Sequence, residues 1–257
     1  MSTPRIQLIT RGDDCGSSHT ANVAILNAFT DGILRNTSIM VPCPAIQDAA
    51  ETLSDRKGLC CGLHATVTAE WDRIRWGPVL PVDKVPSLVD QNGHFFQTTR
   101  ALHDHGARAD EVMAELQAQL DRARYLSFDI RYADQHMMFG WVAEGLDEAF
   151  DTWCAREGIL NDYRYRQSLP KIESAGDPIE HLLAQLSAAE PGQYLVVGHP
   201  AYDNEEMRSH GHPGYSGEEV AVGRNWQRLM FMDARVVGYC RDNGVAPIRY
   251  DEARPLR

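Results

Sequence analysis

The sequence predicts an α/β protein built as a β/α barrel of about seven parallel strands. One observation behind this prediction is that short apolar runs alternate with amphipathic segments along the chain, with no separate run of strands. Another is that acidic and imidazole side chains follow several of these runs, where the strands of a barrel place their catalytic groups. An open doubly wound sheet also fits the alternation, but no G-x-G-x-x-G motif follows the first strand to favour it.

The expected strands are short apolar runs, of which IQLIT and QYLVVGHP are examples. They lie at 6–10, 36–42, 57–67, 127–136, 161–168, 193–200 and 246–252. Helices are expected where apolar side chains recur at close to helical spacing, as Val23, Leu26 and Phe29 do in the first of them. They lie at 17–32, 45–55, 109–125, 141–158, 178–189 and 219–243.

Residues 70–107 interrupt the alternation. They contain Trp71, Trp76, several prolines and an Asn-Gly pair at 92–93. This segment has too few apolar residues for a core of its own, so we interpret it as an irregular insertion. Residues 1–257 are therefore predicted to form a single domain.

The composition excludes several classes of partner. A net charge of −11 without clustered Lys and Arg argues against nucleic acid, and no apolar stretch approaches the roughly 18 residues of a membrane span. The N-terminal MSTPRIQLIT lacks the long apolar core of a signal peptide, and the six cysteines include no C-x-x-C pair. We expect a cytoplasmic protein with reduced thiols. A homo-oligomer is compatible with this composition, which leaves the oligomeric state open.

Polar side chains follow four of the expected strands. Asp13 and Asp14 follow the first strand, His64 lies at the end of the third, His136 follows the fourth, and His199 precedes Pro200 after the sixth. One carboxylate and two imidazoles from three strands suit zinc or another borderline divalent cation. If Asp14 ligates such a cation, Asp13 stays ionised beside it as a base.

Each of these residues also has a structural interpretation. Either aspartate could cap the helix that begins near residue 17. The two histidines after strands three and four could belong to the core, and His199-Pro200 could be only a turn. The second His-Pro pair, His212-Pro213, follows no apolar strand and is expected on a surface loop with no role.

Six segments of the chain carry a family resemblance. In order they are RGDDCG, NTSIMVP, CGLHATVTAEW, RWGPVLP, ADQHM and VVGHPAYDNEEM. From about residue 5 to residue 252 the chain resembles the YdjC/ChbG-type carbohydrate deacetylases. The resemblance implies a distorted (β/α) TIM-like barrel that removes acetyl groups from N-acetylated sugars such as chitooligosaccharides. It also implies one divalent metal ion, Zn²⁺ or Mg²⁺, as the cofactor.

The resemblance assigns roles to the same residues. It implies Asp14, His64 and His136 as metal ligands, Asp13 as the catalytic base, and His199 as the residue of the strand-six His-Pro motif. Two positions depart from the family's usual pattern, because Cys15 replaces an aromatic residue and Gln135 replaces a serine. Both replacements are expected to reshape the acyl or sugar pocket.

The leading hypothesis is metal-dependent hydrolysis of an N-acetyl group. Asp13 would take the proton of the attacking water, and a cationic His199 would protonate the leaving amine. Trp71, Trp76 and Tyr202 could stack on sugar rings, although the tryptophans could equally close the mouth of the barrel as core. Arg166, with Arg164 beside it, could steady a hydroxyl or carboxylate of the substrate or form a solvated salt bridge.

Two other classes of function remain open at this level. Two histidines and one carboxylate also form the metal site of non-haem iron oxygenases, although those ligands usually include a closely spaced His-x-Asp pair on an all-β barrel. A catalytically inactive sugar-binding relative would retain the fold without turnover. A Ser-His-Asp hydrolase is disfavoured because no G-x-S-x-G motif is present.

Overall fold

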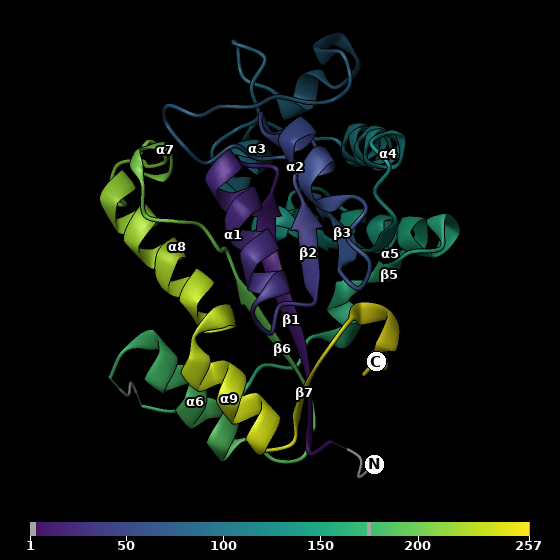
Figure 1. Cartoon of the computed structure of the whole chain (residues 1–257). Helices are drawn as coiled ribbons and strands as arrows, with labels where there is room; N and C mark the ends of the chain where they lie inside the picture. The colour runs from purple at the N-terminus through teal and green to yellow at the C-terminus, as the bar shows by residue number, and fades with distance from the viewer. Residues whose placement is uncertain (1–3, 174–175, 257) are drawn as a thin grey trace.

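The computed structural model describes residues 4–173 and 176–256, which form one curled parallel sheet surrounded by helices (Figure 1). In this part of the chain the strands are β1 (Ile6–Cys15), β2 (Asn36–Ile39), β3 (Cys60–Ala65), β4 (Ile130–Gln135), β5 (Leu160–Asn161), β6 (Gly192–Gly198) and β7 (Val245–Ile248). Their order is β5-β4-β3-β2-β1-β6, and β7 also pairs with β1. All these pairs are parallel, so the predicted α/β class with a curled parallel sheet is confirmed as a half-barrel.

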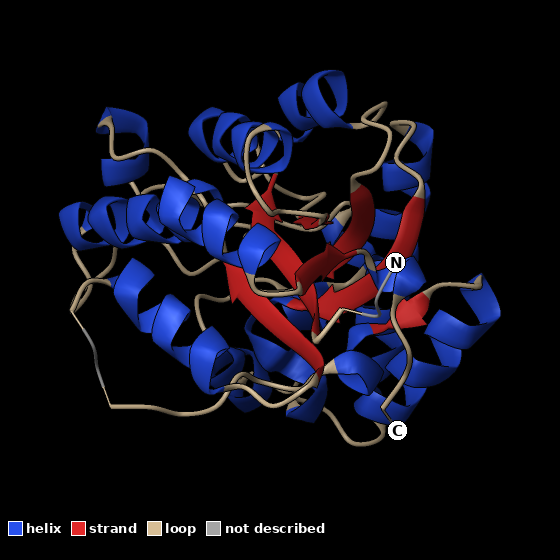
Figure 2. Cartoon of the chain, turned by 60° about the horizontal axis from the view of Figure 1, so that its bottom comes forward, coloured by secondary structure: helices blue, strands red, loops and turns tan. Residues whose placement is uncertain are grey.

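Helices cover the outside of the sheet (Figure 2). The α-helices are α1 (His19–Thr30), α2 (Ile46–Leu53), α3 (Thr99–Asp104), α4 (Ala109–Tyr125), α5 (Leu146–Glu157), α6 (Pro178–Ala188), α7 (Glu205–Arg208), α8 (Gly217–Met232) and α9 (Ala234–Asp242). Short 3₁₀ helices are η1 (Val82–Lys84), η2 (Pro86–Leu88), η3 (His136–Trp141), η4 (Asp162–Tyr165) and η5 (Tyr250–Glu252). None of the helices in the described ranges is both long enough and apolar enough to cross a membrane.

The central strand β1 explains how the sheet brings its polar residues together. Its first residues, Ile6 to Ile9, lie between β6 and β7, whereas Arg11 to Cys15 pair with β2. The strand is buried along nearly all of its length. Because parallel strands end at the same edge of a sheet, the polar ends of β1, β3 and β4 meet there.

Two predicted elements were wrong. The expected strand at 161–168 is only two residues long, because the side chain of Asn161 accepts a hydrogen bond from the amide of Tyr163 and starts the 3₁₀ turn η4. A parallel bridge between Ser168 and Leu195 then brings this segment back beside β6. The expected helix at 219–243 is divided at Asp233, whose extended backbone and side-chain cap begin α9.

The segment at 70–107 packs on the carboxyl ends of the strands rather than forming a core of its own. Its buried side chains Val85, Leu88 and Phe95 belong to the same hydrophobic cluster as β1 and α1. Helix α4 anchors the segment, because the carboxylate of Glu115 accepts hydrogen bonds from the amides of Val79 and Leu80 at 2.9 and 3.0 Å. The insertion is therefore held by hydrogen bonds as well as by apolar contacts.

We expect Glu115→Ala to destabilise the fold. Glu115 is fully buried, and its removal leaves two amides of the insertion without acceptors, which should cost about 2 kcal/mol of unfolding free energy. Urea denaturation would measure this difference. Asp121→Ala on the exposed side of the same helix is the control, with an expected change within about 0.5 kcal/mol. Equal effects of the two substitutions would contradict the anchoring role.

Candidate metal and catalytic site

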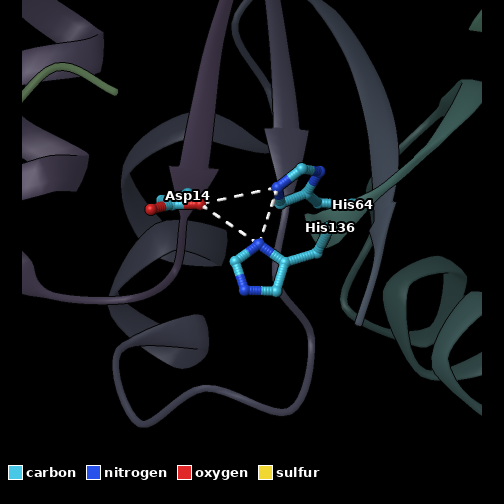
Figure 3. A group of neighbouring side chains, drawn as sticks. All are labelled: Asp14, His64 and His136. Atoms are coloured by element: carbon cyan, nitrogen blue, oxygen red, sulfur yellow. Dashed lines mark hydrogen bonds and ion pairs between the residues drawn. The ribbon is translucent and has the colours of Figure 1, made fainter. Parts of the chain in front are cut away.

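Asp14, His64 and His136 lie side by side at the carboxyl ends of β1, β3 and β4 (Figure 3). The Oδ1 atom of Asp14 is 3.5 Å from Nε2 of His64 and 3.9 Å from Nδ1 of His136. The two ring nitrogens are 3.2 Å apart. All three residues are buried.

The donor atoms of this cluster fit a divalent cation. Asp14 Oδ1 is buried and has no hydrogen-bond partner, which is costly for a carboxylate oxygen unless a ligand satisfies it. The far ring nitrogens are already occupied: His64 Nδ1 lies 2.6 Å from Asp134, and His136 Nε2 lies 3.0 Å from Glu70. Carboxylates that support metal-bound histidines occupy the same position in known sites, where they fix the ring orientation.

A second cluster, formed by Asp13, His64 and Asp134, is less suited to a cation. Both carboxylate oxygens of Asp13 accept hydrogen bonds from the guanidinium of Arg11, at 2.7 and 2.9 Å. The same guanidinium lies 3.2 Å from Asp134 and also pairs with Asp162. Arg11 therefore supplies the positive charge that this cluster needs.

The backbone at Asp14 explains how two adjacent aspartates serve one site. In a regular strand, successive side chains point to opposite faces. Asp14 has a positive φ of 64°, and the register of β1 against β2 shifts between Gly12 and Cys15, so the alternation is broken. Asp13 and Asp14 accordingly line the same cavity. Neither caps α1, because Ser18 does so by accepting a hydrogen bond from the amide of Ala21.

Arg224 on α8 is the other charged neighbour of the cluster. Its Nη2 atom lies 2.6 Å from Oδ2 of Asp14, and its guanidinium lies over the ring of Trp71. Burial alone would raise the pKa of Asp14, but Arg224 and the nearby imidazoles hold that pKa well below its usual range. Asp14 is therefore ionised and available to a cation at neutral pH.

Burial and neighbouring charge also act on His64. Burial alone would lower the pKa of this imidazole, but the carboxylates of Asp134 and Asp13 outweigh burial and raise the pKa well above its usual range. The cluster without a cation therefore favours a proton on His64. A cation and a proton compete for Nε2, because the far nitrogen already faces Asp134.

His199 lines the same cavity, which has a volume of about 620 Å³. The Oε1 atom of Gln227 accepts hydrogen bonds from both the backbone amide and Nδ1 of His199, at 2.6 and 2.9 Å. This arrangement fixes the proton on Nδ1 and leaves Nε2 for a substrate.

Only part of the predicted substrate-binding set reaches the cavity. Trp71 and Arg166 line it, although Arg166 also pairs with Asp162. Trp76 does not, because it is buried and its indole nitrogen donates to the carbonyl of Thr68. Tyr202 is likewise absent from the lining, since its hydroxyl accepts a hydrogen bond from Asn27 on α1. The prediction that these two rings contact sugar from this cavity is not supported by their positions.

Two further expectations need correction. His212 does lie on a loop, as predicted, but it also lines the cavity and stacks on Trp71 with ring centroids 5.9 Å apart. Cys15 was expected to reshape the pocket, yet it is fully buried in the core away from the cavity lining. Gln135 does line the cavity, and its side chain contacts Asp147 and the amide of Gly140.

Sequence reasoning missed the residues that support the cluster. Arg11 and Glu70 lie inside RGDDCG and CGLHATVTAEW, and this position is the sequence signal that points to them. Arg224 and Gln227 lie in the middle of α8, outside every quoted segment, and reach the site only through tertiary packing.

The fold and the cluster together define a parallel α/β protein with buried carboxylate and imidazole groups that fit a divalent cation. The chain belongs to the YdjC-like protein family, whose model matches residues 7–242.

Named relatives agree with this family assignment. A carbohydrate deacetylase of Geobacillus stearothermophilus is 34% identical over 128 residues, which is 50% of this chain and 48% of that protein. This chain thus spans about half the length of that relative in the alignment. A carbohydrate deacetylase of Thermoanaerobacter pseudethanolicus is 26% identical over 95% of this chain and 97% of its own. A crystal structure from Enterococcus faecalis V583 has the same fold, with a TM-score of 0.78, 19% identity, and coverage of 98% of this chain and 99% of that chain.

Proposed function

We propose that this protein is a metal-dependent hydrolase that removes the N-acetyl group from an N-acetylated sugar or oligosaccharide of the chitooligosaccharide type. The observation that carries the proposal is the unpartnered, buried Oδ1 of Asp14 facing two supported imidazoles, next to a second aspartate. The two relatives named carbohydrate deacetylase support the same reaction class. In this proposal Asp14, His64 and His136 hold the cation, Zn²⁺ or Mg²⁺.

When bound, the cation supplies Lewis-acid polarisation of the acetyl carbonyl and acidifies water at the site. Asp13 is the general base that takes the proton from the attacking water. The two hydrogen bonds from Arg11 orient the carboxylate, while each oxygen keeps a lone pair for that proton. Asp13 therefore combines a fixed position with the capacity to accept a proton.

Arg224 has a free donor at the site. Its Nη1 atom is buried and has no hydrogen-bond partner, although its Nη2 atom is held by Asp14. Since Arg224 lines the cavity, a substrate oxygen is the group that would satisfy Nη1. We assign to it the oxygen of the acetyl carbonyl, on which negative charge develops during hydrolysis.

His199 is the general acid of the proposed reaction. Amines leave poorly unless they are protonated, so an imidazolium at Nε2 would transfer its proton to the sugar nitrogen as the C–N bond breaks. His212 also lines the cavity, but its ring is stacked on Trp71. His199 is preferred because Gln227 binds its Nδ1 atom, which leaves Nε2 free at the cavity.

We expect His199→Ala to slow cleavage of the amide by about 10²-fold or more. The leaving group of an activated ester of the same sugar departs without protonation, so the variant should cleave that ester at close to the wild-type rate. Both rates can be followed by the release of acetate. His105→Ala, which removes an exposed imidazole outside the cavity, is the control and should cleave both substrates normally.

The same experiment distinguishes the two histidines of the cavity. If His212→Ala loses amide cleavage while retaining ester cleavage, and His199→Ala retains both, the general acid is His212.

The proposal as a whole is tested with a mixed panel of N-acetylated sugars. The panel should include N-acetylated monosaccharides and oligosaccharides, incubated with the cation-loaded protein and examined by mass spectrometry. We expect at least one member to lose its acetyl group and gain a free amine. If every sugar binds without change, the chain is instead an inactive sugar-binding relative.

A further inference from the structure

A second cavity, with a volume of about 840 Å³, adjoins the candidate site. The two cavities share the side chains of Gln135, Met137, Met138 and Arg166. We call this second cavity the outer chamber. A group bound at the candidate site therefore lies next to the outer chamber, with these four side chains at the boundary between the two cavities.

The walls of the outer chamber expose apolar surface. Met137, Met138 and Trp141 are 38%, 53% and 49% exposed and all line it, with the buried ring of Phe150 behind them. Large apolar side chains gathered next to a polar site are typical of ligand-binding surfaces, and methionine adapts well to varied apolar ligands.

The two methionines are held in place rather than loosely exposed. Met137 and Met138 both have positive φ angles, immediately after the candidate ligand His136. Their sulfur atoms accept contacts from Thr68 at 3.3 Å and from Arg166 at 2.8 Å. The backbone and these contacts therefore hold both side chains at the boundary between the candidate site and the outer chamber.

Several polar groups of the outer chamber already have partners. Asp151 is paired with Arg164 at 2.6 Å and with Asn161 at 3.0 Å. Asp147 accepts a hydrogen bond from Gln135. Because these groups are already paired, fewer hydrogen-bond partners remain for the hydroxyls of a sugar ring.

Charge argues against an anionic occupant. The lining carries four carboxylates and two guanidiniums, and these residues are Asp147, Glu148, Asp151, Asp162, Arg164 and Arg166. A phosphate or carboxylate in the outer chamber would meet an excess of negative charge.

We propose that the outer chamber binds an apolar substituent of the substrate, so that the preferred substrate is an amphiphilic N-acetylated glycoside with an alkyl or aromatic group. This inference rests on the proposed deacetylase function. It assigns to Trp141 and Met138 a role in substrate selection that is separate from the chemistry at Asp13.

Three substrates that differ in the group attached to the N-acetylated sugar test the proposal. They are the methyl glycoside of N-acetylglucosamine, its n-octyl glycoside, and N,N′-diacetylchitobiose. We expect the KM of the octyl glycoside to be about tenfold or more below that of the methyl glycoside, because each buried methylene favours binding. Trp141→Ala and Met138→Gln should each reduce this ratio of KM values. Tyr125→Ala, at the exposed end of α4 and outside both cavities, should leave the ratio unchanged.

Two results would overturn the assignment. One is an octyl preference that is absent in the wild-type protein or that survives both substitutions in the outer chamber. The other is a chitobiose preference that matches the octyl preference and is lost with Trp141→Ala, because the outer chamber would then be a sugar subsite.

A binding measurement separates this inference from the proposed function. n-Octyl β-glucoside has no acetamide, so its binding requires no deacetylation. Below its micelle concentration, calorimetry should show saturable binding that Trp141→Ala weakens by about fivefold or more. Such binding without any deacetylation in the sugar panel would remove the proposed function and retain the apolar chamber. Deacetylation without octyl glucoside binding would retain the proposed function and remove the apolar chamber.

Discussion

His64→Ala and His136→Ala are each expected to lose the bound cation and nearly all turnover. Each substitution leaves two protein ligands of the three proposed. Loss of a supporting residue alone typically reduces metal affinity or activity by about 10- to 100-fold, so loss of a ligand itself should cost more than about 10²-fold in affinity. Metal analysis after dialysis would measure the occupancy, and acetate release would measure turnover.

The physical reason lies in the packing of the site. His64 is fixed by Asp134 and His136 by Glu70, so each ring is held with its other nitrogen toward Asp14. His105→Ala serves as the control for removal of a histidine and should retain about one cation per chain. Full metal content in both His64→Ala and His136→Ala would show that these residues are not the ligands.

Asp13→Asn is expected to keep most of the cation and to lower turnover by about 10³- to 10⁴-fold. An asparagine side chain cannot accept the proton of the attacking water, and the loss of a general base has effects of this order. Arg11 would lose one charged partner but would keep Asp162 and the hydroxyl of Tyr250. The fold should therefore survive, which circular dichroism would check.

Asp14→Asn is the matched comparison at the neighbouring position. It should lose the cation and turnover together, because the unpartnered Oδ1 of Asp14 is the proposed ligand atom. Metal content and acetate release measured on both variants would separate a ligand from a base. If Asp13→Asn loses the cation and Asp14→Asn keeps it, the cation belongs to the cluster of Asp13, His64 and Asp134.

The convergence of Asp14, His64 and His136 could be predicted because it follows from local sequence and topology. Each residue lies at or directly after the end of a strand that forms from a recognisable apolar run. Parallel strands place these ends at the same edge of the sheet. The order of the elements brings the three strand ends together, and the break in alternation at Asp14 lets its side chain line the same cavity as Asp13.

Other parts of the site depend on tertiary packing that the sequence does not reveal. Arg224 lies in the middle of α8, and only the packing of that helix beside the site brings its guanidinium to Asp14. Trp76 and Tyr202 have the ring chemistry of sugar-binding residues, but hydrogen bonds to Thr68 and Asn27 hold them elsewhere. Residue type alone could not distinguish them from Trp71, which does line the cavity.

We propose that one divalent cation, held by Asp14, His64 and His136, is required for this protein to deacetylate an N-acetylated sugar. Its most direct test is to strip the wild-type protein with a chelator and titrate Zn²⁺ or Mg²⁺ back while measuring acetate release from an N-acetylated sugar identified by the panel. We expect no acetate from the stripped protein and full recovery at about one cation per chain. Undiminished acetate release from protein shown by metal analysis to be cation-free would contradict it.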